Sequence, residues 1–257
     1  MVPFLYFFYD RPDLFGVVVS PDARVVLAHG TSLFVILPTS VRGALAYHKV
    51  HLVEWRAVWG IGLGSVVAAL LGARLASVLP PEALKTGFGA LLIFSGVRMV
   101  YRRAAALPEP PTPAPGPRLD LRYTIPTGLL VGLFASLLGV GGGTVAIPLL
   151  IYLLRFDVRQ VAATSIGIIT VTSAAGTLGY MISGYGAPGL PPWTIGYVDL
   201  AAGVLMFLAA VVSVRWGAAI NQRLRPRTLE LLFGVVFIVI GLRLAGANLV
   251  ALVANAL

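Results

Sequence analysis

Four glycines and a proline interrupt one long apolar run of the chain. Gly139, Gly141, Gly142 and Gly143 are followed by Pro148 in the stretch GVGGGTVAIP. Glycine can adopt a positive φ at little steric cost, whereas proline lacks a backbone N–H and disfavours helical conformation at the residue before it. Inside a membrane, such backbone is tolerated where it is buried in protein or lines a cavity. The stretch therefore predicts a broken helix whose free N–H groups bind an anion. The alternative is close helix packing through small residues.

Paired hydroxyl residues recur at a fixed spacing in both halves of the chain. Each half has two Thr-Ser pairs eight residues apart, which is close to two helical turns, so both pairs project from a similar face. Hydroxyl donors on one face suit an oxyanion, and we predict that they line the site. The alternative is that each hydroxyl bonds a carbonyl of the preceding turn or a neighbouring helix. The residues are Thr31, Ser32, Thr39, Ser40, Thr164, Ser165, Thr172 and Ser173.

Two further side chains inside the first apolar run could contribute charge. Arg42 lies deep in this run, and a charge inside a membrane span is costly and by default functional. Its alternative is to reach the interface near Lys49. His29 is either a proton-responsive group or a histidine satisfied at the interface. Glu54 and Asp199 each precede an apolar run, where a carboxylate favours the helix dipole, so we interpret both as structural caps.

Composition identifies the environment of these residues. The chain of 257 residues is 58% hydrophobic and only 11% charged, which excludes an ordinary soluble domain. Its formal charge is +9, but the arginines lie between apolar runs, so membrane orientation explains them better than nucleic-acid binding. There are no cysteines and only three histidines, so neither a metal site nor another cofactor is predicted. We predict an all-α polytopic membrane protein.

Apolar runs bounded by charged or turn residues predict seven complete spans and an initial fragment. A proline-rich segment, 105–122, reads as a linker and divides the chain into a first transmembrane repeat, 1–104, and a second, 123–257. Each repeat would contain about four transmembrane helices. The predicted spans are 26–47, 53–76, 83–101, 123–154, 160–182, 195–220 and 228–250.

The two halves match each other in register. An offset of 145 pairs Glu54 with Asp199 and places Gly89 on Gly234, and it also aligns Pro81, Gly96 and Arg98 with Pro226, Gly241 and Arg243. Upstream, an offset of 133 pairs the Thr-Ser positions, so the second half has a longer loop at 184–194. Chance matching of small residues would give scattered identities, so these ungapped blocks favour an internal repeat. On this register the first helix of the first repeat is truncated, and we hypothesise that the native chain begins upstream of Met1.

These motifs resemble the sulfite exporter TauE/SafE family, also called the 4-toluene sulfonate uptake permease family. The resemblance is carried by the glycine stretch with Pro148, by Ala163-Thr164-Ser165, by the repeated Thr-Ser pairs and by the ending from Phe233 to Gly241. It implies an eight-span transporter that moves sulfite, sulfonates or related sulfur-containing anions across the cytoplasmic membrane of a bacterium or archaeon. The glycines, Pro148 and the Thr-Ser positions would then bind substrate.

Other classes of function stay open at this stage. A passive anion channel or a membrane scaffold would share the composition, and homo-oligomers fit both. An intramembrane hydrolase would need a base beside a serine, and the second half has no histidine. A Ser173–His29 or Ser165–His48 pair across the halves is the remaining arrangement. We therefore predict a transporter, and not an enzyme, with the lipid bilayer and a small anion as its partners.

Overall fold

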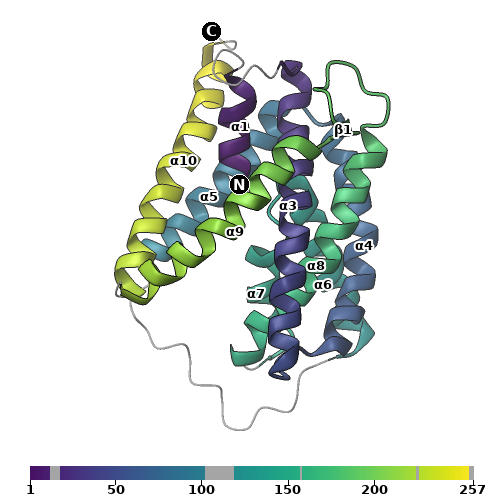
Figure 1. The fold of residues 1–257 in the computed structure, drawn as a ribbon, viewed down its shortest axis with the longest axis vertical. Helices are drawn as coiled ribbons and strands as arrows, with labels where there is room; N and C mark the ends of the chain where they lie inside the picture. The colour runs from purple at the N-terminus through teal and green to yellow at the C-terminus, as the bar shows by residue number, and fades with distance from the viewer. Residues whose placement is uncertain (12–17, 102–118, 157, 224–225, 255–257) are drawn as a thin grey trace. The chain divides into compact units, whose positions relative to one another are not determined.

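A computed structural model describes residues 1–11, 18–101, 119–156, 158–223 and 226–254, with backbone only for 158–159, 214–223, 226–227, 229–230 and 247–254. Nine helices and one short strand pair form within these ranges (Figure 1). The helices are α1 (Val2–Asp10), α3 (Pro21–Lys49), α4 (Trp55–Val78), α5 (Pro81–Tyr101), α6 (Leu121–Leu138), α7 (Gly143–Tyr152), α8 (Val158–Ser183), α9 (Leu200–Arg223) and α10 (Pro226–Ala254). The strands are β1 (Thr194–Ile195) and β2 (Val198–Asp199).

The predicted spans correspond to these helices, except that the start of the predicted span 195–220 lies in the strand pair and α9 begins only at Leu200. Five helices in the described ranges, namely α3, α4, α5, α6 and α8, are long and apolar enough to cross a membrane, and α9 and α10 contain shorter apolar stretches. The predicted span 123–154 is divided into α6 and α7 by the glycines. Of the predicted linker, only residues 119–122 lie within the described part of the chain, and α6 already begins at Leu121.

The chain forms two compact units, each of which draws segments from both predicted repeats. Unit 1 consists of Met1–Leu79 and Thr112–Phe207, and unit 2 consists of Pro80–Pro111 and Leu208–Leu257. These units are defined by packing contacts, whereas the predicted repeats are defined by sequence similarity, so the units do not test the repeat boundaries. The predicted boundaries 1–104, 105–122 and 123–257 therefore stay a prediction.

In unit 1, α4 packs closely along α6 because small residues face each other. Gly64 lies against Gly128, whose Cα would be 3.3 Å from a Cβ at position 64. Two turns farther on, a Cβ at Gly72 would lie 3.1 Å from the Cβ of Ser136, so the two helices run parallel. Backbones can approach this closely only where side chains are absent or small.

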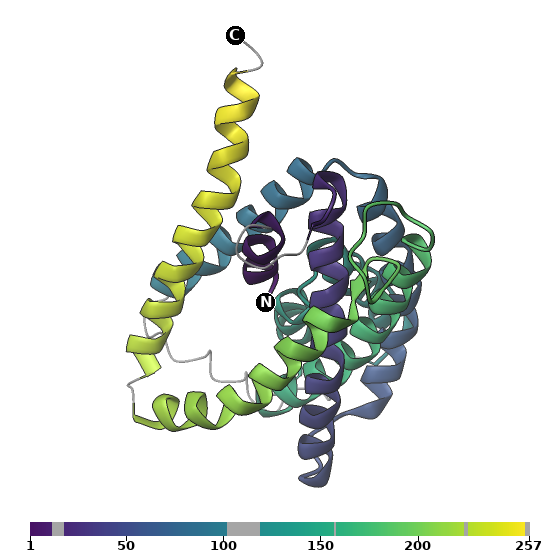
Figure 2. The same cartoon turned by 45° about the horizontal axis from the view of Figure 1, so that its top comes forward.

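The helix α3 packs antiparallel against α8 in the same unit. A Cβ at Gly43 would lie 3.1 Å from Ile166 Cγ2, and one at Gly176 would lie 2.7 Å from Leu33 Cδ1. α3, α4, α6 and α8 lie side by side in both views (Figures 1 and 2). Buried apolar side chains of α4, α6, α7 and α8 form one cluster, which includes Ile61, Val131, Leu150 and Ile168.

In unit 2, α5 and α10 pair through two reciprocal glycine contacts. A Cβ at Gly89 would lie 2.9 Å from the carbonyl oxygen of Gly241, and one at Gly241 would lie 2.7 Å from that of Gly89. Gly96 and Gly234 face each other in the same way, at 2.6 and 3.0 Å. As the numbers rise on α5 they fall on α10, so this pair is antiparallel.

The loop predicted at 184–194 leads into a structure that the sequence did not predict. Thr194 pairs with Asp199 and Ile195 with Val198 in a two-stranded antiparallel hairpin. Gly196 has a φ of 55°, which suits the tight turn between the strands. The hairpin delivers Asp199 to the start of α9.

Replacement of Gly128 by leucine should destabilise unit 1. A Cβ at this position would overlap the carbonyl oxygen of Ile61 and lie 2.9 Å from the Ser65 nitrogen, so α4 and α6 would have to separate. Overpacking of this kind costs about 1–3 kcal/mol or more. We expect a lower unfolding temperature of the purified protein in detergent. Gly246→Leu is the matched control, because no described atom lies within 4 Å of a Cβ there. Equal unfolding temperatures for the two variants would contradict this packing.

Candidate functional site

The predicted helix break forms at the glycines and leaves a row of free amides. α6 ends at Leu138, and its cap Gly139 has a left-handed φ of 63°. Gly141 and Gly142 follow with φ of 74° and 84°, and α7 begins at Gly143. In the described part of the chain, the N–H groups of Gly141, Gly142, Gly143 and Thr144 donate no hydrogen bond, whereas Val145 and Ala146 donate to the Gly142 carbonyl. These free donors start a helix whose dipole favours an anion.

The break lies level with the middle of two long helices. A Cβ at Gly141 would lie 3.1 Å from Ile36 and 3.3 Å from Ile169, and Ile169 also lies 3.0 Å from a Cβ at Gly143. Ile36 is near the centre of α3 and Ile169 near the centre of α8. The break therefore lies against apolar side chains near the middle of two candidate membrane spans.

The other side of the break is tied down by hydrogen bonds. Ser32 Oγ donates to the Gly139 carbonyl at 2.9 Å, and the Tyr180 hydroxyl donates to the Ser136 carbonyl at 2.7 Å. Gly139 and Val140 donate to carbonyls in the last turn of α6. The carbonyls of Ala135, Ser136 and Gly139 thus accept hydrogen bonds, whereas the first N–H groups of α7 donate none to the described residues.

Pro148 does not contribute to the break, contrary to the prediction of a broken segment from Gly139 to Pro148. It lies inside α7, which continues to Tyr152. Because proline has no N–H, the carbonyl of Thr144 one turn earlier loses its helical donor. The glycines alone interrupt the helix, and the role of Pro148 in substrate binding stays a prediction.

Seven of the eight predicted Thr-Ser hydroxyls are buried, and all eight are bonded within the protein. Thr39 and Ser40 donate to carbonyls of the preceding turn, as do Ser165, Thr172 and Ser173. This is the back-bonding alternative. Of the eight, Ser32 is bonded to the glycine break in this conformation. Direct anion binding by the other hydroxyls stays a prediction.

Thr31 and Thr164 each receive a hydrogen bond from the start of a distant helix. The backbone N–H of Asp199 donates to Thr31 Oγ1 at 3.0 Å, and that of Glu54 donates to Thr164 Oγ1 at 3.2 Å. Asp199 caps α9 through its Oδ1, which accepts from the Ala202 N–H at 2.9 Å, so its interpretation as a cap is confirmed. Glu54 is the N-cap residue of α4 but makes no side-chain cap bond.

Arg42 is exposed on α3, seven residues before the helix ends at Lys49. The ion pair formed among the described residues joins Arg24 to Asp10 at 2.9 Å and does not involve Arg42. This position fits the interfacial alternative as well as it fits a cavity, so a contribution of Arg42 to anion binding stays a prediction.

Sequence spacing did not predict a buried network of polar side chains that lies next to the break. The Tyr6 hydroxyl bonds to His29 Nε2, and the Tyr9 hydroxyl donates to Asp199 Oδ2 at 3.0 Å. His29 is fully buried, and its backbone lies against Gly139. Buried tyrosines at an interval of three on one short helix were the available signal, because each such hydroxyl needs a partner.

Neither serine–histidine pair of the hydrolase alternative is present. Ser165 and Ser173 donate to the carbonyls of Ala162 and Thr170, while His48 Nδ1 accepts from Trp55 Nε1 at 2.9 Å. The described hydrogen bonds therefore assemble no nucleophile and base.

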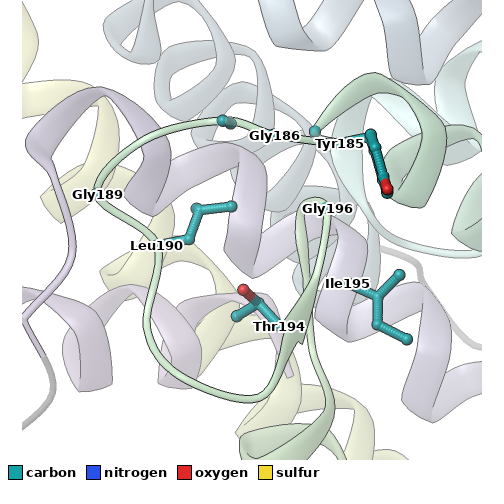
Figure 3. Close-up of a pocket in the computed structure, with 9 residues that line it drawn as sticks. Tyr185, Gly186, Gly189, Leu190, Thr194, Ile195 and Gly196 are labelled. Carbon is teal, nitrogen blue, oxygen red and sulfur yellow. The ribbon is translucent and has the colours of Figure 1, made fainter.

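A pocket lies in the connection between α8 and α9 and shares no residue with the break. Figure 3 shows its rim, with the side chains of Leu190 and Thr194 beside the hairpin and that of Tyr185 at its edge. Tyr185 is 87% exposed. Four of the nine lining residues are glycines, and no lining residue carries a charged side chain.

Comparisons with known proteins agree with the membrane architecture. The family described as "Sulfite exporter TauE/SafE" matches residues 1–244. A "Probable membrane transporter protein" of Methanocaldococcus jannaschii is 30% identical over 247 residues, which cover 94% of this chain and 85% of the relative. The "Probable membrane transporter protein YunE" of Bacillus subtilis is 26% identical over 261 residues, which cover 95% and 88%. No solved structure matches.

The family match covers nearly the whole chain, including the glycine break and the Thr-Ser pairs on which the resemblance was based. That resemblance is therefore confirmed, as is a multi-pass membrane location. The chain belongs to the sulfite exporter TauE/SafE family of prokaryotic membrane transporters.

Proposed function

We propose that the protein transports sulfite, sulfonates or related sulfur-containing anions by alternating access. The observation that carries this proposal is the amino end of α7, where four consecutive N–H groups donate no hydrogen bond to any described residue, level with the middle of α3 and α8. Such a site can bind an anion through backbone N–H groups and the helix dipole, with no positively charged side chain. The family description supports the sulfur-oxyanion class, and the substrate undergoes no chemical change.

Reciprocal contacts in unit 1 support an internal repeat. At the offset of 133, Leu33 is equivalent to Ile166 and Gly43 to Gly176, and the observed contacts are Gly43 with Ile166 and Gly176 with Leu33. The hydrogen bonds follow the same rule. Glu54 is equivalent to Asp199 and Thr31 to Thr164, and each acidic residue donates its N–H to the threonine of the other half.

Unit 2 has the same internal reciprocity. Gly89 and Gly234 are equivalent at the offset of 145, as are Gly96 and Gly241, and the contacts are Gly89 with Gly241 and Gly96 with Gly234. Equivalent helices that pair antiparallel are expected of repeats with inverted topology. We infer that 1–104 and 123–257 are two such repeats.

The proposed anion site lies where the two repeats meet. Ile36 and Ile169, which flank Gly141, are themselves equivalent at the offset of 133. A substrate between them would contact both repeats, so rocking of one repeat against the other would expose it to alternate sides. In this proposal the Thr-Ser hydroxyls and Arg42 become available to the anion as the helices move.

Flux in proteoliposomes tests the proposal. We expect saturable uptake of radiolabelled sulfite or methanesulfonate, with faster uptake when unlabelled anion is present inside, because a carrier exchanges one substrate for another. Conductance without such exchange would indicate a channel. If neither anion moves above the rate of protein-free liposomes, the proposed substrate class is wrong.

A further inference from the structure

Two hydrogen bonds at equivalent positions join the proposed repeats on opposite sides of the break. The Asp199 N–H donates to Thr31 Oγ1, and the Glu54 N–H donates to Thr164 Oγ1. On α3, Thr31 precedes Ile36, which contacts the break, and Thr164 precedes the equivalent isoleucine on α8. Because α3 and α8 are antiparallel, the two bonds lie on opposite sides of the break. They are named below the Asp199 contact and the Glu54 contact.

The Asp199 contact is reinforced by a buried tyrosine. The Tyr9 hydroxyl donates to Asp199 Oδ2 at 3.0 Å, while Oδ1 accepts from the Ala202 N–H at 2.9 Å. Tyr9 is 0% exposed and Asp199 is 3% exposed. Tyr9 lies on α1 in the first proposed repeat and Asp199 lies in the second, so this bond also joins the repeats. A hydrogen bond to a carboxylate is stronger than one between neutral groups.

The Glu54 contact has no such reinforcement. At the offset of 145, which also aligns Pro3 with Pro148, Tyr9 is equivalent to Leu154. Leu154 is fully buried in the apolar cluster that includes the first turn of α4, and it has no side-chain donor to offer to Glu54. The Glu54 carboxylate accepts no hydrogen bond from the described residues. The two contacts therefore match in their backbone bonds and differ in their side-chain bonds.

This difference makes the two ends unequal in the free energy needed to open them. Rocking of one repeat against the other must break one contact before water and the anion can enter from that side. Opening at the Glu54 contact breaks one backbone bond to a hydroxyl. Opening at the Asp199 contact breaks the equivalent bond and also takes the Tyr9 hydroxyl from the carboxylate. The second opening is therefore less populated by about tenfold or more.

We propose that Tyr9 latches one end of the transporter, so that the unloaded protein opens preferentially at the Glu54 contact. This inference rests on the proposed alternating access. An anion that arrives on the side of the Asp199 contact finds the open state less often. Its apparent affinity from that side is lowered by the same fraction.

Two equivalent residues can report which end is open. Leu33 lies between Thr31 and the level of the break, and Ile166 lies in the same position after Thr164. Because the chain has no cysteine, Leu33→Cys and Ile166→Cys each provide a single thiol. The rate of modification by a water-soluble maleimide is measured in lipid nanodiscs without substrate, relative to the rate in unfolded protein. We expect Leu33→Cys to react at least about tenfold more slowly than Ile166→Cys.

Tyr9→Phe removes the hydroxyl and keeps the aromatic ring. In this variant we expect the rate at Leu33→Cys to rise at least about tenfold, while the rate at Ile166→Cys stays constant or falls. Thr164→Val removes the acceptor of the other contact. It should raise the rate at Ile166→Cys about fivefold without raising that at Leu33→Cys.

Asp10→Asn is the control for a general loosening of α1. Asp10 neighbours Tyr9 and is exposed, and it pairs with Arg24 at 2.9 Å within the first proposed repeat. Its loss should change both rates by less than about twofold. Equal rises at both reporters in Tyr9→Phe, or no rise at Leu33→Cys, would overturn the latch. The rates need no substrate, so a wild type that moves neither sulfite nor methanesulfonate would refute the proposed function and leave the latch standing.

Discussion

Gly142→Leu should abolish anion transport, with a loss of at least about a hundredfold, while the protein still inserts into the membrane. Gly142 is the N-cap of α7 and has a φ of 84°, which costs a non-glycine residue roughly 1–2 kcal/mol. A Cβ there would lie 2.8 Å from Val131 Cγ1 and 3.2 Å from Ala135 Cβ, so α7 must also move away from α6. That movement displaces the amides that we assign to the anion. The measurement is uptake by proteoliposomes with matched protein content.

Gly186→Leu separates backbone strain from displacement of the site. Gly186 has a φ of 75°, but a Cβ there meets no atom within 4 Å. This variant suffers a similar conformational penalty on an exposed loop, so its transport should stay near that of wild type. Equal transport by the Gly142 and Gly186 variants would contradict the site assignment.

The helices and the break were predictable because both depend on local sequence. Apolar runs bounded by charged residues predicted each long helix, since a membrane span requires about 20 apolar residues. Gly139, Gly141 and Gly142 adopt left-handed φ, which is the conformation that other residues resist. Pro148 was misplaced because we expected the helix to end before it, whereas α7 continues through Pro148 to Tyr152 despite the lost hydrogen bond and the crowding of the preceding turn.

The polar contacts were less predictable because they depend on three-dimensional packing. The spacing of the Thr-Ser pairs placed them on one face of each helix. A hydroxyl on that face can bond either a carbonyl of its own helix or a ligand, and the spacing does not distinguish these two cases. The Tyr6–His29 and Tyr9–Asp199 bonds join residues 23 and 190 positions apart. The repeat offset identified Thr31 and Thr164 as equivalent positions, but it did not predict that they accept hydrogen bonds from Asp199 and Glu54.

Cross-linking α3 to α8 should stop transport reversibly, and the chain is suited to this test because it has no cysteine. Leu33→Cys with Gly176→Cys forms one pair, and Gly43→Cys with Ile166→Cys forms the reciprocal pair. Both pairs are in contact in this structure, on opposite sides of the level of Ile36 and Ile169. Rocking of one repeat against the other must separate at least one pair in each outward or inward excursion. We expect a short bifunctional thiol reagent that is cleaved by reductant to lower uptake at least about twentyfold in either double variant.

The single-cysteine variants treated with the same reagent serve as controls, since they carry the modification without a link between helices. Their uptake should stay within about twofold of untreated protein, and reductant should restore the double variants. A fully cross-linked double variant that transports at the wild-type rate would show that α3 and α8 move as one body. The two-repeat mechanism would then be wrong even if the anion binds at the α7 amides, because the site would have to open by movement of α7 alone.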